Sequence, residues 1–287
     1  MTISVGAVKA QLAEHWGIAG DEVALGETFV AHHERLVCEA VDPAGRRVAV
    51  KAAVDRVRLR AEVTALRAAA ATGVDVPEVL THLHGGAGEL SLLVMSWVEG
   101  EPLLSTSSDR HWSAVAGALR VLHDRGCVDG LPSFGGDPDW RRSFRDWLAT
   151  WQERPPVRDL FPPSVLRRLL AVASTVSAAA APVLRLLHGD SSTIHWRVNR
   201  PGGVAAIDLG DSCVGDPLWD LVTLTHWDDA RLPVVLDGYG ADPQLRNRAE
   251  ALYEPYRVSR HLLAIDWLCD HGFDPMPTVK ELTRLAA

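Results

Sequence analysis

The stretch HGDSSTIH, residues 188–195, follows a short apolar run, Val183–Leu187. Its third residue is an aspartate, Asp190. A second short apolar run, Val204–Ile207, also leads into an aspartate, Asp208, which lies eighteen residues beyond Asp190. Short apolar runs of this length are typical of strands, and the polar residues after them lie in loops at the strand ends. We therefore expect the two aspartates to face a common crevice.

Two carboxylates delivered in this way supply part of what phosphoryl transfer needs. The reaction also requires a cation that holds the polyphosphate. Lys51, at the end of the run Val48-Ala49-Val50-Lys51, is a candidate for that cation, and Glu62 on the following predicted helix can pair with it. Each residue alone also has an ordinary explanation, because lysines on strands and carboxylates on helix faces are usually solvated.

The first third of the chain has the pattern of a small antiparallel sheet. Two β-rich runs, 36–41 and 47–52, flank Asp-Pro-Ala-Gly at 42–45, which has the residue placement of a type I turn and predicts a hairpin. Apolar residues recur at helical spacing over 54–71, and a second hairpin is predicted over 78–94 around a glycine-rich turn. This part of the chain is expected to be a sheet with one main helix.

Helical spacing dominates the rest of the sequence. The N-terminal residues also read as a short amphipathic helix. The helices predicted after residue 100 cover 108–126, 140–151, 164–180 and 247–268, the last with a local interruption at Pro255. The motif Gly-Asp-Pro-Leu-Trp-Asp-Leu at 215–221 opens a further helix, in which Asp216 and Asp220 are expected to be structural carboxylates.

The bulk composition excludes several classes of protein. Hydrophobic residues make up 47% and charged residues 23% of the 287 residues, so neither disorder nor a fibrous repeat is expected. A net charge of -8 argues against a nucleic-acid surface and leaves room for a cationic small substrate. Since no secretory signal and no membrane-spanning stretch is recognisable, we expect a cytoplasmic protein without a membrane partner. The four scattered cysteines suit free thiols.

Acidic and aromatic residues gather around the catalytic stretch in sequence. They are Asp211, Asp228, Asp229, Trp196, Trp219, Trp227 and His226. Walls of this kind suit a cationic or sugar-containing small molecule, through charge, cation–π attraction and stacking. Most of the tryptophans are expected to lie in the core.

The ordered set of motifs resembles the aminoglycoside phosphotransferase family of antibiotic phosphotransferases. The set comprises VAVK at 48–51, Glu62, LLVMSWVEG at 92–100, HGD at 188–190, ID at 207–208 and GDPLWDL at 215–221. The resemblance covers roughly residues 20–260. It implies an α+β, protein-kinase-like fold of two lobes, with an N-terminal nucleotide-binding lobe at 1–98 and a helical catalytic and substrate-binding lobe at 99–287.

The resemblance also implies an activity and a role for individual residues. ATP, with GTP as an alternative, would bind between the lobes with Mg²⁺ or Mn²⁺, and its terminal phosphate would pass to a hydroxyl of a small molecule, often an antibiotic. Asp190 would be the catalytic base and Asp208 the main metal ligand. Lys51 would anchor the phosphates with Glu62 as its partner, and the backbone of Met95, Ser96 and Trp97 would meet the adenine.

The sequence departs from the family pattern at His195, because the related loops read HGDxxxxN and their asparagine would ligate metal. An imidazole nitrogen suits Mn²⁺ or a softer ion better than Mg²⁺. Three explanations are open. His195 points away while water completes the metal shell, it ligates the metal directly, or the site binds nucleotide without turnover.

A second departure is the segment 26–33, which stands where a glycine-rich phosphate loop is expected but contains a single glycine. His32 and His33 in it are read as exposed polar residues. The leading hypothesis is therefore an antibiotic O-phosphotransferase. A metabolic small-molecule kinase and a catalytically silent nucleotide- or antibiotic-binding module are the alternatives.

Overall fold

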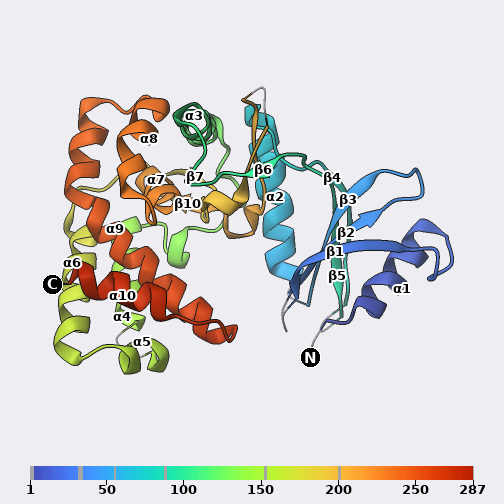
Figure 1. Cartoon of the computed structure of the whole chain (residues 1–287), viewed down its shortest axis with the longest axis horizontal. Coiled ribbons are helices and arrows are strands. Elements are labelled where there is room, and N and C mark those ends of the chain that lie inside the picture. The colour runs from blue at the N-terminus through green and yellow to red at the C-terminus, as the bar shows by residue number, and fades with distance from the viewer. Residues whose placement is uncertain are drawn as a thin grey trace.

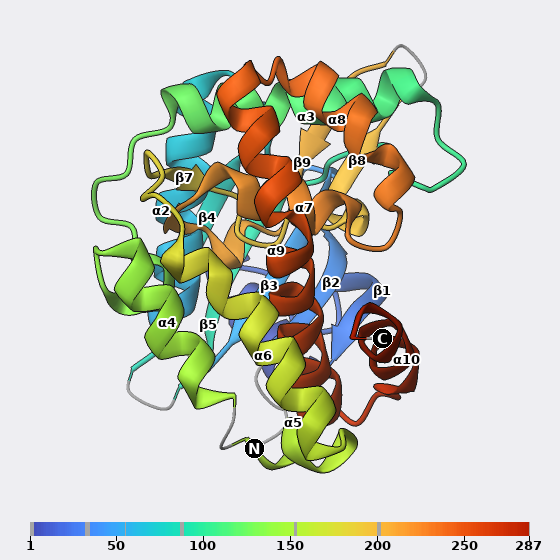
Figure 2. The ribbon, with the colours of Figure 1, turned by 90° about the vertical axis from the view of Figure 1, so that its left-hand side faces the viewer.

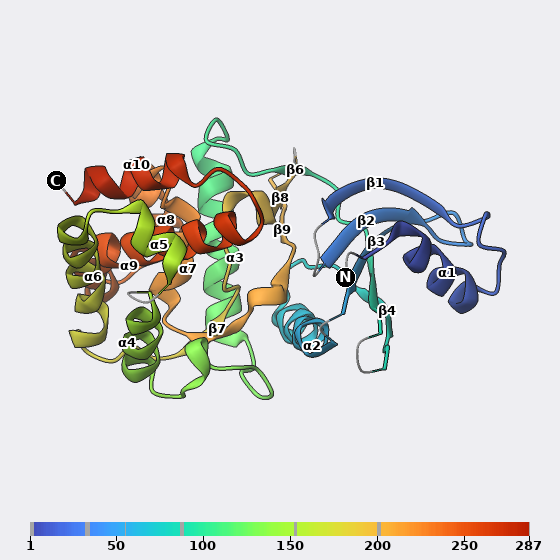
Figure 3. The same ribbon diagram turned by 90° about the horizontal axis from the view of Figure 1, so that it is seen from below.

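The computed structural model describes residues 3–31, 35–54, 56–86, 89–151, 154–199 and 202–286. Figures 1 and 3 show a sheet with two flanking helices at one end of the molecule and a larger group of helices at the other. Both predicted hairpins and the predicted α+β class are confirmed. Residues 32 and 33, expected to be exposed, lie outside the described residues.

A five-stranded antiparallel sheet forms the N-terminal part of the chain. Its strands run in the order β1-β2-β3-β5-β4, and their bounds are β1 Ala24–Ala31, β2 Arg35–Val41, β3 Arg47–Ala53, β4 Val79–Leu83 and β5 Ser91–Ser96. β1 occupies residues 26–31 of the segment that stands where a phosphate loop is expected, and a role of this segment in covering phosphate stays a prediction. The predicted lobe boundary at 98 and 99 follows the end of β5 and stays a prediction.

The sheet lies between two helices because its side chains alternate between its faces. On β3, Val48, Val50 and Ala52 are buried in one cluster with α1 (Val5–Trp16). Ala53 belongs to the cluster on the opposite face, with α2 (Arg56–Thr72), and Figure 1 shows the two helices on either side of the sheet. Because side chains two apart on a strand share a face, Lys51 lies on the α2 face.

The remainder of the chain is mainly helical. Its helices are α3 Asp109–Arg125, α4 Trp140–Thr150, α5 Pro155–Leu160, α6 Pro163–Ala178, α7 Pro217–Thr225, α8 Leu232–Tyr239, α9 Pro243–Asp270 and α10 Met276–Leu285. Two small antiparallel sheets accompany them, β10 with β7 and β6 with β8 and β9. Their strands are β6 Glu101–Pro102, β7 Arg185–Leu187, β8 Trp196–Val198, β9 Val204–Ala206 and β10 Cys213–Gly215.

The long helix α9 organises this part of the molecule. Its Val258, Leu262 and Ile265 pack in one buried cluster with residues of α4, α5, α6 and α10, and Figure 2 shows α5 and α6 beside it. Pro255 lies inside α9 without ending it. The helix therefore runs further in both directions than the predicted span.

Two further findings concern possible membrane spans and the cysteines of the described residues. None of their helices has both the length and the apolar character that crossing a membrane requires. All four cysteines are free thiols, as expected, with Cys38 and Cys213 buried.

Candidate active site

Lys51 connects the sheet to the helical part of the molecule. Its Nζ donates to Glu62 Oε1 on α2 at 2.5 Å and to Asp208 Oδ1 at 2.8 Å. Lys51 and Glu62 are only 2% and 1% exposed. Burial alone would lower the pKa of Lys51, but the two carboxylates raise it above its ordinary value, so the amine stays charged. The expected pairing of Lys51 with Glu62 is therefore present.

Asp208 follows β9, as expected for an aspartate at a strand end. Among the described residues, Asp208 is the one non-glycine residue with a left-handed backbone, at a φ of 57°. Backbone strain of this kind is common at functional sites. Arg35 Nη1 lies 3.5 Å from Oδ1. Burial would raise the pKa of Asp208, but Lys51, His195 and Arg35 hold it well below its usual range. Asp208 is therefore an ionised carboxylate, the form that a metal ion requires.

The loop that carries Asp190 is held by hydrogen bonds to α7. Asp220 on α7 accepts hydrogen bonds from the backbone N–H groups of His188 at 2.7 Å and Gly189 at 3.0 Å, and it pairs with His123 Nε2 at 3.0 Å. Gly189 has a φ of +86°, and a Cβ there would lie 1.9 Å from the Asp211 carbonyl oxygen. Only glycine fits this position.

Asp190 has a basic side chain near each of its carboxylate oxygens. Arg260 Nη2, from α9, donates to Oδ1, and His195 Nδ1 lies 3.6 Å from Oδ2. Burial would raise the pKa of Asp190, but Arg260 and His195 hold it below its ordinary value. Asp190 is therefore an ionised side chain, and among the described residues His195 is the one basic group within ion-pair distance of its Oδ2.

His195 lies between the two aspartates and does not point away from them. Its Nδ1 donates to the Asp190 backbone carbonyl at 2.9 Å. A carbonyl only accepts, so Nδ1 carries the proton and the lone pair of the neutral ring is on Nε2. Nε2 lies 3.7 Å from Asp208 Oδ2. The first of the three explanations for His195 therefore does not hold in this structure.

Asp208 and His195 fit one metal ion as a pair of ligands. A backbone carbonyl orients the imidazole through its other nitrogen, as is usual for metal-binding histidines. Within the described residues no group of three or more His, Cys, Asp or Glu side chains has the spacing of a metal cage. A metal here would therefore take further ligands from phosphate oxygens and water, which is common for ions that accompany nucleotides.

The segment expected to meet adenine lies at the end of β5. Met95 is buried against α2, and the Ser96 N–H donates to the Glu78 carbonyl at 2.9 Å. The Ser96 amide is therefore not a free donor for a nucleobase. The Trp97 ring lies 5.8 Å from the Phe29 ring of β1, so β1 covers the chain where it leaves the sheet.

The sequence and the fold can now be compared with known proteins. The sequence model of the phosphotransferase enzyme family matches residues 30–257, about four fifths of the chain. The chain belongs to the phosphotransferase enzyme family. No protein among the curated sequences matches it significantly.

Solved structures of antibiotic phosphotransferases share the fold of this phosphotransferase. The aminoglycoside phosphotransferase APH(4)-Ia superposes with a TM-score of 0.72 at 16% identity, covering 99% of this chain and 100% of its own. The spectinomycin phosphotransferase APH(9)-Ia, in complex with ADP and spectinomycin, gives 0.67 at 14% identity, covering 99% and 98%. An amicoumacin kinase with AMP-PNP and Ca²⁺ gives 0.70 at 16% identity, covering 99% and 93%.

Three acidic residues that lie near the catalytic loop, residues 188–195, in the sequence of the phosphotransferase are ion-paired. Asp211 pairs with Arg58 at 2.7 Å, Asp228 with Arg231 at 3.4 Å and Asp229 with Arg257 at 2.7 Å. These pairs reduce the net negative charge that the acidic residues can offer a cationic ligand.

The aromatic residues of the same group divide into core and surface. Trp196, Trp219 and His226 are buried, in line with the expectation that most tryptophans lie in the core, whereas Trp227 is 57% exposed. The Trp227 ring packs edge-on against His261 of α9 at 4.7 Å. Trp227 is therefore the member of the group that is available to a ligand.

Three residues that contact the site carry no signal in the sequence. Arg35 and Arg260 reach Asp208 and Asp190 from β2 and α9, and His123 reaches Asp220 from α3. None belongs to a motif, and an arginine on a strand or helix is usually solvated. Only the tertiary fold brings them to the aspartates.

Asp216 and Asp220 are the structural carboxylates that the sequence predicts. Asp216 caps α7 by accepting from the Leu218 N–H at 3.0 Å. It also accepts from the Tyr256 hydroxyl at 2.6 Å and pairs with Arg248. α7 is thereby tied to α9, and it carries Asp220 to the catalytic loop.

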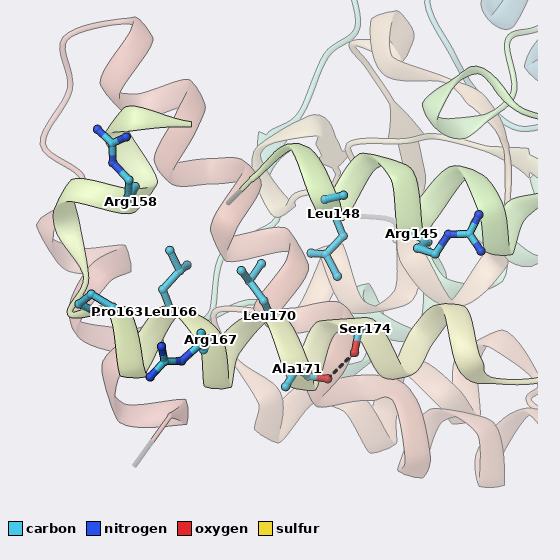
Figure 4. Close-up of a pocket in the computed structure, with 10 residues that line it drawn as sticks. Arg145, Leu148, Arg158, Pro163, Leu166, Arg167, Leu170, Ala171 and Ser174 are labelled. Carbon is cyan, nitrogen blue, oxygen red and sulfur yellow. Dashed lines mark hydrogen bonds between the residues drawn. The ribbon is translucent and has the colours of Figure 1, made fainter. Parts of the chain in front are cut away.

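A surface hollow of about 580 Å³ lies elsewhere, between α4, α5 and α6 (Figure 4). Leu148, Leu166 and Leu170 form its apolar floor, and Arg145, Arg158 and Arg167 lie around it. No predicted site residue lines it. The hollow is therefore separate from the proposed chemistry of the phosphotransferase.

Proposed function

We propose that this phosphotransferase moves the γ-phosphate of ATP, with GTP as an alternative donor, to a hydroxyl of a small molecule. The observation that carries the proposal is that Lys51 contacts Asp208 across 157 residues of sequence, while His195 lies between Asp208 and Asp190. Antibiotics are the acceptors we favour, because neighbours of the same fold were solved with hygromycin B and with spectinomycin. The reaction would then inactivate the drug.

Each charged residue has one role in this reaction. Lys51, held by Glu62, anchors the phosphates, and Asp190 receives the acceptor proton through Oδ2. The positive charge of Lys51 offsets the negative charge that the phosphate oxygens carry in the transition state. The backbone from Trp97 onward, with Met95 and Ser96 behind it, borders the adenine.

Asp208 and His195 would hold the divalent metal. A bound Mg²⁺ or Mn²⁺ would bridge the phosphates and neutralise part of their charge. The nitrogen ligand makes Mn²⁺ the better fit, because Mg²⁺ strongly prefers oxygen. Asp208 Oδ1 is engaged by Lys51, so Oδ2, which faces His195, is the oxygen left for the metal.

The acceptor site is proposed beside Asp190 and Trp227. The exposed Trp227 ring can stack on a sugar ring or attract a cationic group. A sugar-containing acceptor suits this site better than a highly cationic one, since the nearby aspartates are ion-paired.

Transfer of labelled phosphate from ATP and from GTP across an antibiotic panel, with Mg²⁺ and with Mn²⁺, tests the proposal. We expect a phosphorylated product from the wild type and a loss of at least about a thousandfold in kcat for Asp190→Ala. In cells, resistance should depend on Asp190. Absence of product, together with equal resistance from the wild type and Asp190→Ala, would remove the proposal.

A metabolic kinase is the second candidate, and the ion-paired state of Asp211, Asp228 and Asp229 favours it. A site with little net negative charge has no special affinity for polycationic drugs. A panel extended to amino alcohols, sugars and nucleosides discriminates between the two. Product formed only from those metabolites selects the metabolic kinase.

A further inference from the structure

Arg260 is a largely buried arginine whose charge is directed at Asp190. Its side chain is 13% exposed, and Nη2 donates to Asp190 Oδ1 across seventy residues of sequence. Among the described residues, Asp190 is the one carboxylate within ion-pair distance of Arg260. Its Nε is buried and makes no hydrogen bond there. A buried arginine that serves one partner is costly to fold unless that contact is useful.

The other buried arginine of this stretch of α9 has a different function. Arg257 lies three residues earlier, donates to the His226 carbonyl and pairs with Asp229 and Glu281. These contacts tie α9 to α10 and to the chain after α7. Among the described residues, the ion pair of Arg260 is with Asp190 alone, and it does not join α9 to another helix. Its contact with Asp190 therefore needs its own explanation.

The geometry at Asp190 suggests that explanation. A carboxylate rotates easily about its last side-chain bond, so an unrestrained Asp190 would present either oxygen to an incoming hydroxyl. The guanidinium of Arg260 holds Oδ1, and a charged hydrogen bond of this kind is both strong and directional. Oδ2 is left on the side of His195 and Asp208, where the metal and the phosphates are proposed.

We propose that Arg260 is a positioning residue that holds Asp190 with Oδ2 directed at the acceptor hydroxyl. The inference rests on the proposed phosphotransferase function. In the step concerned, the hydroxyl oxygen bonds to the γ-phosphorus while the bond from that phosphorus to the β-phosphate oxygen breaks. The electron pair of the broken bond stays on the nucleoside diphosphate. The hydroxyl proton passes to Asp190 Oδ2 and then to water.

The test compares four variants in the same transfer assay: Arg260→Gln, Arg260→Lys, Arg260→Ala and the matched control Arg257→Ala. A misplaced reacting group costs on the order of a hundredfold in rate. We expect a loss of kcat of about that size for Arg260→Gln and a smaller loss for Arg260→Lys. The KM for ATP should stay within about twofold of the wild type, because binding of the nucleotide does not involve Asp190.

Chemical rescue separates positioning from folding. Guanidinium at millimolar concentration should restore part of the kcat of Arg260→Ala, because it can occupy the vacated site beside Asp190. The same addition should not restore Arg257→Ala, whose defect is structural. Thermal melting of each variant identifies any that fails to fold, in which case Arg260→Lys carries the comparison.

The outcomes distinguish the inference from the proposed function. A wild type that transfers no phosphate to any acceptor overturns both. An active wild type with unchanged kcat in Arg260→Gln overturns the inference alone, as does a rise in acceptor KM at unchanged kcat, which would make Arg260 a binding residue. Equal guanidinium rescue of the Arg260→Ala and Arg257→Ala variants also overturns it.

Discussion

His195 is the residue at which this chain departs most informatively from the expected family pattern. Its Nε2 faces Asp208 at 3.7 Å while Nδ1 is fixed by a carbonyl. Replacing it by asparagine restores an oxygen ligand, so His195→Asn should raise the preference for Mg²⁺ over Mn²⁺ by roughly tenfold. Direct binding of Mn²⁺, followed by electron paramagnetic resonance with a nucleotide analogue, measures the affinity without turnover.

The control for this variant is His111→Asn, because His111 lies on α3 outside the site. An Mn²⁺ affinity unchanged in His195→Asn would mean that the imidazole does not reach the metal. A gain of phosphate transfer with Mg²⁺ would instead indicate that His195 holds back turnover, as in the silent-module alternative.

Gly189 is the second residue on which the structure of the site depends, because its position has no room for a side chain. Gly189→Ala forces a Cβ into the Asp211 carbonyl at a left-handed backbone position. We expect it to lower the free energy of unfolding by about 3 kcal/mol and to abolish transfer. Gly272→Ala is the matched control, since its φ is +74° but nothing lies within 4 Å.

Urea unfolding of both variants measures the difference. Gly272→Ala should cost about 1 kcal/mol, from the backbone conformation alone. Equal losses in the two glycine variants would show that the loop can move away from Asp211, and that the contact does not require glycine.

At this scale the sequence predicts the residues that chemistry requires but not those that support them. Lys51, Glu62, Asp190 and Asp208 are recognisable because phosphoryl transfer needs their functional groups and because their order along the chain resembles that of the family. Arg260 serves Asp190 from seventy residues away, and no local pattern marks it. The orientation of His195 depends on the Asp190 carbonyl and the Ser192 hydroxyl, and no motif encodes these contacts.

Among the elements, α7 and α9 support the active site together. Asp216 and Asp220 on α7 hold α9 and the catalytic loop, while α9 supplies Arg260. His261 of α9 is fully buried beside His226, with Arg257, Arg260 and Glu281 around it. Burial, aided by the two arginines, lowers the pKa of His261 to about 4. The packing of these two helices therefore depends on an uncharged histidine.

This histidine predicts a pH dependence of stability. In the unfolded chain His261 takes up a proton near pH 6.5, whereas in the folded protein it does so only near pH 4. The unfolded state therefore binds more protons between these values, and stability falls as pH falls from 6.5 to 4. The loss amounts to roughly 3 kcal/mol for this residue.

His261→Gln should remove most of that loss, because glutamine does not titrate. Urea unfolding of the wild type and the variant at pH 7.5 and pH 4.5 measures it. The difference between the two pH values should be smaller in the variant, even if the variant is less stable at both. An identical pH dependence would assign the effect to His226 or to the surrounding carboxylates.

At the element scale the strongest periodic patterns predict correctly and the weaker ones do not. The hairpin of β2 and β3 is recognisable from its alternation and its turn, and α3 from its apolar spacing. The sequence predicts no strand over β1, and Gly26 lies inside that strand without ending it. The short helices α5, α8 and α10 have too few turns for a clear period, and α9 continues through Pro255 because its neighbours hold it.

For the whole molecule, the ion pairs of Lys51 and Arg58 link the sheet to the helical part across the site. Lys51 reaches Asp208, and Arg58 on α2 reaches Asp211. The α+β class follows from the order of the motifs. The relative placement of the two parts follows from contacts between distant residues, which periodicity cannot show. A nucleotide that binds between the two parts would therefore add a third link.

Nucleotide binding should accordingly stabilise the folded protein. AMP-PNP with Mn²⁺ at a hundred times its Kd adds about 2.7 kcal/mol, which for a chain of this size raises Tm by roughly 4–5 °C. Lys51→Met removes the proposed phosphate anchor and leaves Glu62 buried without its cation, so it lowers Tm by itself. The double variant Lys51→Met with Glu62→Leu avoids that unpaired charge and is the better comparison. Its Tm should shift by less than about a third of the wild-type value under the same ligand concentration, and a full shift would place the nucleotide away from Lys51.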